Sequence, residues 1–358
     1  ARNKSLNFLS EAAATRLGMS IHQRTEKINR RLCSRRDGRN SGHFHRSAKS
    51  HHRDLGSHGR YFLKKNSVRF VRRNFKRVSE RKLTTRDLLV LEFLWTWKAA
   101  STAMLKEVAY KNDSFWWVYK ALRRLKQEKY IQLLPRGRNL DLEVWALTRN
   151  GFEIVLMDRD DLEQYRYRVH APAHDYLATC LQLGDLWQSH VDAQFFTEQQ
   201  LSSLASWNFP AAFKAVDGHI PDGLTQIRGA LHTVTIGYEV DLNLKPEERY
   251  ERTAEFYREG LKPNLVVWLV RNPWIAEKIF WILKRREYAR DEQSLSKLHV
   301  FVLLEDFKRN AWGAKVIGGP LRGETVRKLH QNLIQKAGKT TVKLAQKAMT
   351  GIFFPKFK

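Results

Sequence analysis

The composition of the chain changes abruptly at Leu83, and this change limits where a compact fold can form. Residues 1–83 contain 23 Lys or Arg against 5 Asp or Glu, and the stretch Arg35–His58 consists mostly of Arg, His, Ser and Gly. Such a segment has few apolar side chains to bury, and its like charges repel one another. We therefore expect a basic N-terminal extension over 1–83, with the folded part of the 358-residue chain beginning after it.

The net charge indicates which partner to consider first. The chain carries a formal charge of +27 at pH 7, and about 42% of its residues are hydrophobic, enough to form sizeable cores. Self-repulsion at this charge disfavours a compact state unless a polyanion screens it. Nucleic acid is the polyanion that this balance favours. The alternative is a basic protein that is merely soluble.

Cysteine usage and apolar run lengths indicate a cytoplasmic protein with no membrane insertion. Cys33 and Cys180 lie in different regions and form no metal-type pair, which is typical of a reducing compartment. The longest uninterrupted apolar run, Leu265–Val270, is far shorter than the roughly 18 residues of a membrane span.

Apolar periodicity after Leu83 predicts three helices followed by two short strands. The first helix is expected to have Thr84 or Thr85 as its N-cap and to end at Trp97. The other two helices are expected over Thr102–Tyr110 and Phe115–Glu128, and the strands over Tyr130–Leu134 and Leu142–Thr148. Three helices and a hairpin in this order are the plan of a winged helix-turn-helix. We expect a winged-helix DNA-binding domain over 84–160.

The third predicted helix carries the cations expected at a DNA interface. One face has apolar residues at helical spacing, and most other positions are basic or aromatic. Candidate DNA-binding residues lie on this helix, at the tip of the hairpin and in the N-terminal extension: Lys120, Arg123, Arg124, Lys126, Arg136, Arg138, Arg72 and Arg73. Such cations suit a phosphate backbone, although a winged helix used for protein contacts is the alternative. For Trp116, Trp117 and Tyr119 two roles remain open: some are expected in the core or at an interface, and one could stack on a base.

The remainder of the chain predicts an α/β sandwich over 165–310 and a basic tail over 320–358. Helix and strand patterns follow the order α-β-β-β-α-β, then a further helix and strand. The elements are His174–Gln188, Ala193–Thr197, Gly218–Leu224, His232–Leu242, Pro246–Glu259, Leu265–Val270, Pro273–Tyr288 and Lys297–Leu304. The expected fold is thus an α+β multidomain protein with basic helical or flexible extensions at both ends, including a helix over Thr341–Met349.

The strand predicted over His232–Leu242 carries two carboxylates on one face. Its apolar residues alternate with polar or small ones, so Glu239 and Asp241 point to the same side, and Lys245 shares that side if the strand continues. Asp222, at the end of the preceding strand, can meet Glu239 across a turn. Grouped carboxylates are the ligands that Mg²⁺ or Mn²⁺ prefers. Such an ion can activate a nucleophile and stabilise charge on a phosphodiester.

Pro221-Asp222 followed by Glu239 resembles the motif of the PD-(D/E)xK nuclease superfamily, whose core has the same α-β-β-β-α-β order. The resemblance implies a restriction-endonuclease-like sandwich in which Glu198 is an additional acid and metal ligand. The chain departs from the motif two positions after Glu239, where Asp241 replaces the superfamily's lysine. Lys245 is the candidate replacement, unless the helix predicted from Pro246 turns it away.

A larger constellation resembles the replication-relaxation family, and within it the MobC-type plasmid mobilisation relaxases. It combines the winged helix, His170, His174-Asp175, Pro221–Leu224 and Tyr238–Lys245, and it spans roughly Leu83–Glu305. The resemblance implies metal-dependent nicking of one DNA strand at a transfer origin, without the tyrosine nucleophile and histidine triad of ordinary relaxases. The implied partners are double-stranded and single-stranded DNA and an accessory mobilisation protein.

The resemblance also implies roles for individual residues. Asp222, Glu239 and Asp241 would hold the metal, Lys245 would steady the transition state or orient water, and His174 would lie near the scissile phosphate. Ordinary structural roles remain open for each, because Asp-Gly is a common turn, strand carboxylates can be solvated, and a histidine can cap a helix or lie in a core. Two other functions remain open: a non-catalytic DNA-binding replication or regulatory protein with a degenerate nuclease fold, and a double-strand DNA nuclease.

Overall fold

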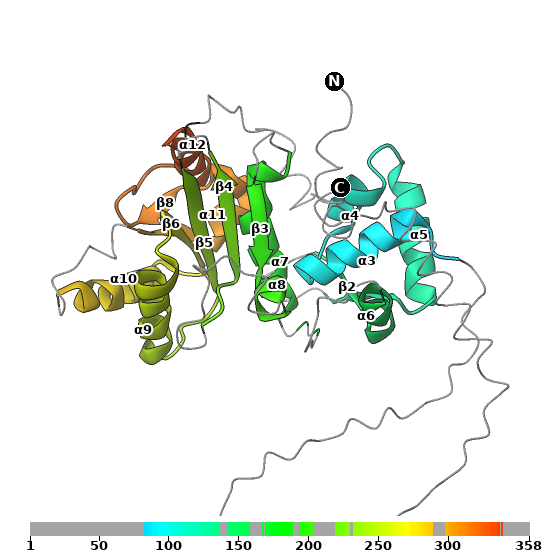
Figure 1. Cartoon of the computed structure of the whole chain (residues 1–358), viewed down its shortest axis with the longest axis horizontal. Helices are drawn as coiled ribbons and strands as arrows, with labels where there is room; N and C mark the ends of the chain where they lie inside the picture. The colour runs from blue at the N-terminus through cyan, green and yellow to red at the C-terminus, as the bar shows by residue number, and fades with distance from the viewer. Residues whose placement is uncertain are drawn as a thin grey trace, which may run out of the picture.

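The structure is a computed structural model of the chain, and the part that it describes has an α+β fold with helices and one mixed six-stranded sheet (Figure 1). The described residues are 82–135, 142–157, 167, 169, 171–188, 193–203, 219–229, 232–288, 298–336 and 338. Several predictions lie outside these residues, namely those on residues 1–81 with Arg72 and Arg73, on the hairpin tip with Arg136 and Arg138, on His170, and on the helix Thr341–Met349.

A group of short helices and a two-stranded hairpin forms the first part of the described chain. In order these are α3 (Thr85–Trp97), α4 (Thr102–Ala109), α5 (Phe115–Gln127), β1 (Ile131–Leu134), β2 (Val144–Leu147) and α6 (Arg149–Leu156). The strands are antiparallel, with Ile131 opposite Leu147. All five elements predicted here are confirmed to within two residues at each end, and α6 was not predicted.

A buried acid holds α3 against α5. Asp87 accepts a hydrogen bond from the Thr84 backbone N–H at 2.8 Å, and the Thr84 hydroxyl accepts one from the Asp87 N–H at 3.2 Å, which forms a capping box. The same carboxylate, fully buried, contacts Arg124 of α5 at 2.5 Å. The residues that begin α3 therefore also determine how it packs.

The sheet has the strand order β3-β4-β5-β6-β7-β8. Its strands are β3 (Ala193–Thr197), β4 (Gly223–Arg228), β5 (Thr233–Asp241), β6 (Leu265–Val270), β7 (His299–Leu303) and β8 (Val316–Gly318). The first three are antiparallel to one another, β5, β6 and β7 are parallel, and β8 is antiparallel to β7. The parallel pairs need helical crossovers, which α9 (Glu247–Glu255) and α10 (Pro273–Tyr288) supply. All six side chains of β6 are buried, as expected of a strand covered on both faces.

Helices cover both faces of the sheet. On one face, α7 (Pro172–Leu183) and α12 (Val326–Lys336) pack with the side chains of Ile236 and Val240. On the other, α9, the following π-helical segment Phe256–Leu261 and α10 pack with Leu224 and Trp268. The short helices α8 (Glu198–Ser203) and α11 (Leu304–Asn310) follow β3 and β7. The helical first part lies beside the β3 edge of the sheet (Figure 1).

Two predicted boundaries, those of the strand near Asp222 and of the basic C-terminal tail, are wrong. The strand predicted over Gly218–Leu224 begins only at Gly223, where pairing with Thr197 starts. Asp222 therefore lies just before a strand, whereas the prediction placed it at the end of one. The basic tail predicted from residue 320 contains α12, in which Val326, Leu329, His330 and Ile334 are buried. The high cation content of that region had concealed an apolar stripe at helical spacing. In the described residues, no helix is long and apolar enough to cross a membrane.

A buried histidine in α12 is expected to make the free energy of unfolding depend on pH. His330 is fully buried against Trp312, with Nε2 2.9 Å from the Tyr238 hydroxyl and Nδ1 2.8 Å from the Val326 carbonyl oxygen. Burial lowers the pKa of His330 to about 4. The unfolded chain therefore binds a proton that the folded chain does not, between pH 6.5 and 4, and stability falls as the pH falls through that range.

At about 1.4 kcal/mol per pKa unit, this single group should cost about 2 kcal/mol of stability at pH 5. Urea unfolding at pH 7 and pH 5 measures the effect. His330→Gln is the matched variant, because its amide can still accept from Tyr238 but does not titrate. The loss of stability on acidification should be smaller in His330→Gln by about that amount, and equal losses would contradict the assignment.

Candidate functional site

The register of β4 and β5 places Asp222 beside Glu239. Gly223 is opposite Tyr238 in the antiparallel pair, so the residue before Gly223 lies next to the residue after Tyr238. The Val240 backbone N–H donates a hydrogen bond to Asp222 Oδ2 at 2.7 Å and holds the carboxylate at this end of the sheet. Asp222 lies beside Glu239 as predicted, but it comes immediately before β4 and not at the end of a strand.

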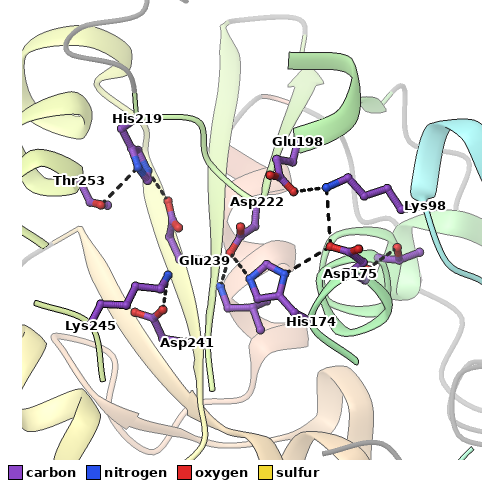
Figure 2. A network of polar contacts seen from close by, with 12 residues as sticks. Lys98, His174, Asp175, Glu198, His219, Asp222, Glu239, Asp241, Lys245 and Thr253 are labelled. Carbon is purple, nitrogen blue, oxygen red and sulfur yellow. Dashed lines mark hydrogen bonds and ion pairs between the residues drawn. The ribbon is translucent and has the colours of Figure 1, made fainter. Parts of the chain in front are cut away.

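The N-terminal turn of α7 brings His174 to Asp222 (Figure 2). His174 Nε2 lies 3.2 Å from Asp222 Oδ2, and its Nδ1 lies 3.6 Å from Asp175 Oδ1. Burial opposes a charge on the imidazole, but Asp222 and Asp175 outweigh it and raise the pKa of His174 well above its usual value. Burial likewise opposes the charge on Asp222, but His174 outweighs it and lowers the pKa of Asp222 to about 2. The two side chains form an ion pair at neutral pH.

Two side chains orient one oxygen of Glu239. His219 Nε2 lies 2.9 Å from Glu239 Oε1, and the Tyr257 hydroxyl donates to the same oxygen at 2.6 Å. A Cβ added at Gly237 would lie 2.8 Å from the Tyr257 ring, so a glycine is needed for this tyrosine to reach the strand. The pKa of His219 is raised because the nearby Glu239 outweighs its burial, whereas burial, together with Asp222, raises the pKa of Glu239 itself.

Asp241, the last residue of β5, pairs with Lys245, the candidate replacement for the lysine of the nuclease motif. Asp241 is fully buried, and the Lys245 ammonium contacts its Oδ1. The Tyr250 hydroxyl accepts a hydrogen bond from the Lys245 backbone N–H at 3.0 Å, which fixes the turn before α9. Burial opposes the charge on Lys245, but Asp241 and Asp222 outweigh it and raise the pKa of Lys245. The helix that begins after Pro246 therefore does not turn this cation away from the carboxylates.

A second lysine reaches the site from the helical first part of the chain. Lys98 follows α3 with a φ of 60°, a conformation that costs free energy for a residue other than glycine. Its ammonium lies 2.5 Å from Glu198 Oε2 and 3.7 Å from Asp175 Oδ1, and it lines a small hollow together with Asp222. Burial opposes its charge, but these acids outweigh it and raise the pKa of Lys98.

The same junction holds the two parts of the chain together. The Thr179 hydroxyl donates to the Trp97 carbonyl oxygen at 3.1 Å, and the Thr197 hydroxyl donates to the Thr96 carbonyl oxygen at 2.7 Å. Both bonds join the end of α3 to elements that carry site residues. The relative position of helices and sheet is therefore determined next to the acidic cluster.

The acidic cluster is thus larger than the predicted one. It contains five carboxylates and four cationic or basic side chains, which are Asp175, Glu198, Asp222, Glu239, Asp241, Lys98, His174, His219 and Lys245 (Figure 2). Lys98 and His219 were not among the predicted site residues. His219 lies just before Pro221-Asp222, where proximity to the motif was an available signal, but nothing local marks Lys98.

Each of the four predicted metal ligands has a carboxylate oxygen with no hydrogen-bond partner among the described residues. Asp222 makes both its side-chain contacts through Oδ2 and Glu239 makes both through Oε1, so Asp222 Oδ1 and Glu239 Oε2 have no hydrogen-bond partner among the described residues. Asp241 Oδ2 and Glu198 Oε1 are likewise without a partner in the described part of the chain, but the other oxygen of each contacts a lysine. Within the described ranges, no group of three His, Cys, Asp or Glu side chains forms a ready set of ligands. Asp222 and Glu239 are the two of these acids that contact no described lysine, so they could hold an ion without displacing an ammonium group.

No family model, curated protein or solved structure matches the chain.

The predicted DNA-binding residues of α5 divide into two groups. Lys120, Arg123 and Lys126 are exposed and available to a partner. Arg124 instead pairs with the buried Asp87, and it also lies 3.7 Å from Glu128. Asp87 raises the pKa of Arg124 against the opposing effect of burial, so this guanidinium has a structural role within the helical part.

Proposed function

We propose that this chain is a metal-dependent DNA endonuclease that nicks one strand, and that it acts as a relaxase at a transfer origin in plasmid or mobile-element mobilisation. The observation that carries the proposal is the juxtaposition of Asp222 and Glu239, each with one carboxylate oxygen left for an ion, close to the charged Lys245. The choice of a relaxase among strand-cleaving enzymes rests on the resemblance of the sequence stretches to that family.

The order of elements supports the same proposal. Helix α7, strands β3, β4 and β5, helix α9 and strand β6 follow the α-β-β-β-α-β order of the restriction-endonuclease-like core, with the short helix α8 inserted between β3 and β4. Helices α3, α4 and α5 with the β1–β2 hairpin follow the order of a winged helix-turn-helix. The two parts meet at Lys98, which contacts Asp175 and Glu198.

Each side chain of the site has a stated part in the proposed reaction. A Mg²⁺ or Mn²⁺ ion at Asp222 and Glu239 would act as a Lewis acid toward the scissile phosphodiester. His174 holds Asp222 ionised, and His219 with Tyr257 orients Glu239 so that Oε2 stays available. Lys245 remains protonated and can donate to a phosphate oxygen as negative charge accumulates there.

A non-catalytic DNA-binding regulator with a degenerate nuclease fold is the second candidate. One observation favours it: each of the five carboxylates lies within 4.0 Å of a lysine or histidine, so these side chains can offset the negative charges without a metal ion. Asp241 in the place of the motif lysine agrees with this alternative.

The products of cleavage separate these functions. Supercoiled plasmid carrying transfer-origin DNA is incubated with the protein and Mn²⁺ or Mg²⁺, and the topological forms are resolved on a gel. Nicking of one strand predicts open circles, a double-strand nuclease predicts linear DNA, and a regulator predicts intact supercoils together with retained binding. Linear or unchanged plasmid would therefore contradict the proposal, and incubation with EDTA controls for metal dependence.

A further inference from the structure

Four aromatic side chains at the start of α5 are exposed. The exposed fractions are 49% for Phe115, 61% for Trp116, 53% for Trp117 and 45% for Tyr119. Trp116 and Trp117 contact each other edge to face with ring centroids 4.6 Å apart, so they form one surface instead of isolated side chains. Leaving such rings in water costs hydrophobic free energy, and contiguous exposed apolar surface of this kind usually marks a binding site.

Lysines are interleaved with these rings. The Lys120 ammonium lies 5.1 Å from the Trp116 centroid and 4.8 Å from that of Trp117, and the Lys106 ammonium lies 5.6 Å from the Phe115 centroid. The sequence of α5 contains no Asp or Glu. The preceding acid, Asp113, pairs with Arg86 at 2.6 Å. The surface formed by Lys106, Phe115, Trp116, Trp117, Tyr119 and Lys120, here called the aromatic–lysine face, is therefore positively charged.

The chemistry of this face favours single-stranded nucleic acid over a protein partner or duplex DNA. The centre of a protein–protein interface is depleted in lysine, so cations between the rings argue against a protein partner. In duplex DNA the faces of the bases are already stacked, and a helix in the groove meets only their edges. Unpaired bases offer free faces for stacking, and the adjacent phosphates match the lysines.

We propose that the aromatic–lysine face of α5 binds single-stranded DNA, with bases stacked on Trp116 and Trp117 and phosphates held by Lys120 and Lys106. The inference deepens the proposed function, since a nicking enzyme separates a strand from its duplex, but it does not depend on cleavage. Helix α5 lies on the side of the helical part away from the sheet (Figure 1), so the face is distinct from the acidic cluster.

The test compares single-stranded and duplex binding in EDTA, where no metal-dependent cleavage occurs. The full chain, the double variant Trp116→Ala/Trp117→Ala and the control Trp274→Ala/Trp281→Ala are titrated into labelled oligo(dT) and into a duplex of the same length. The control removes two tryptophans of α10 that are 52% and 64% exposed, the second of them also next to a lysine, Lys284. All four side chains are exposed, so both variants should fold.

We expect the α5 variant to lose at least about 10- to 100-fold in affinity for oligo(dT), because stacking of one base on an aromatic ring contributes about 5- to 150-fold. Its affinity for the duplex should stay within about threefold, and the control variant should match the wild type. The difference between variant and wild type should persist at high salt, since stacking releases no counterions. The proposal is overturned if the full chain fails to bind oligo(dT), or if the α5 variant binds it as well as the wild type. It is also overturned if the α5 variant loses as much affinity for the duplex as for oligo(dT), or if the control variant loses as much affinity for oligo(dT) as the α5 variant.

The result is distinguishable from a failure of the proposed nuclease. Asp222→Asn leaves α5 unchanged, so it should bind oligo(dT) as the wild type does. If the chain does not cleave plasmid but prefers single-stranded to duplex DNA in a way that depends on Trp116 and Trp117, the proposed nuclease is wrong and the single-strand binding face stands.

Discussion

Asp222→Asn should reduce strand cleavage by more than about 100-fold, because removal of groups that merely orient metal ligands already costs about 10- to 100-fold. Asparagine keeps an oxygen for the Val240 N–H but lacks the negative charge that would hold a divalent ion and that keeps His174 protonated. The rate of open-circle formation with Mn²⁺ measures the effect, and the affinity for Mn²⁺ itself, measured by calorimetry, should fall in parallel.

The control for this variant is Glu277→Gln, which removes a negative charge from an exposed position of α10. It should cleave and bind Mn²⁺ as the wild type does. Asp222→Asn should retain duplex binding, because the exposed cations of α5 are unaffected. Cleavage that continues at the wild-type rate in Asp222→Asn would show that this carboxylate holds no catalytic ion.

Lys245→Met should destabilise the fold by about 3 kcal/mol, the cost of leaving one member of a buried ion pair without its partner. The affected partner is Asp241, which is fully buried and contacts the Lys245 ammonium. Urea unfolding at pH 7 measures the loss. Burial already raises the pKa of Asp241, and removal of the cation should raise it further, so protonation should recover part of the lost stability as the pH falls.

A double variant separates this structural role of Lys245 from a role in the reaction. Asp241→Asn/Lys245→Met removes both charges and should unfold close to the wild type, because replacing both partners is often nearly neutral. If Lys245 contacts the phosphate, the stable double variant should remain inactive, whereas Asp241→Asn alone should keep activity. An active double variant would show that Lys245 serves only to neutralise Asp241.

The pairing of acids with cations suggests how the cluster is maintained before substrate binds. Five carboxylates at one end of a sheet would repel one another, and Lys98, His174, His219 and Lys245 offset that repulsion. These cations come from α3, α7, the segment before β4 and the turn before α9. The arrangement leaves Asp222 ionised, which a divalent ion requires of its ligand.

Periodicity was sufficient to predict most of the described elements. Thr85–Trp97, Ala193–Thr197, Leu265–Val270 and Pro273–Tyr288 have the boundaries that capping residues, strand alternation or apolar runs indicated. The predictions were wrong where the local pattern was weak. The stretch Gly218–Leu224 lacks alternation, and its strand begins where β3 provides a partner. The cation-rich α12 is stabilised by contacts such as that of His330 with Trp312.

The sequence by itself determined that Glu239 and Asp241 share one face of a strand, because side chains alternate along any extended chain. It also determined which segments can be buried and that the chain as a whole is basic. Only the tertiary structure decided which acid meets which cation. Lys98 and Glu198, 100 residues apart, contact each other because α3 docks beside β3. Such contacts depend on packing between distant elements, which the period of a local pattern does not encode.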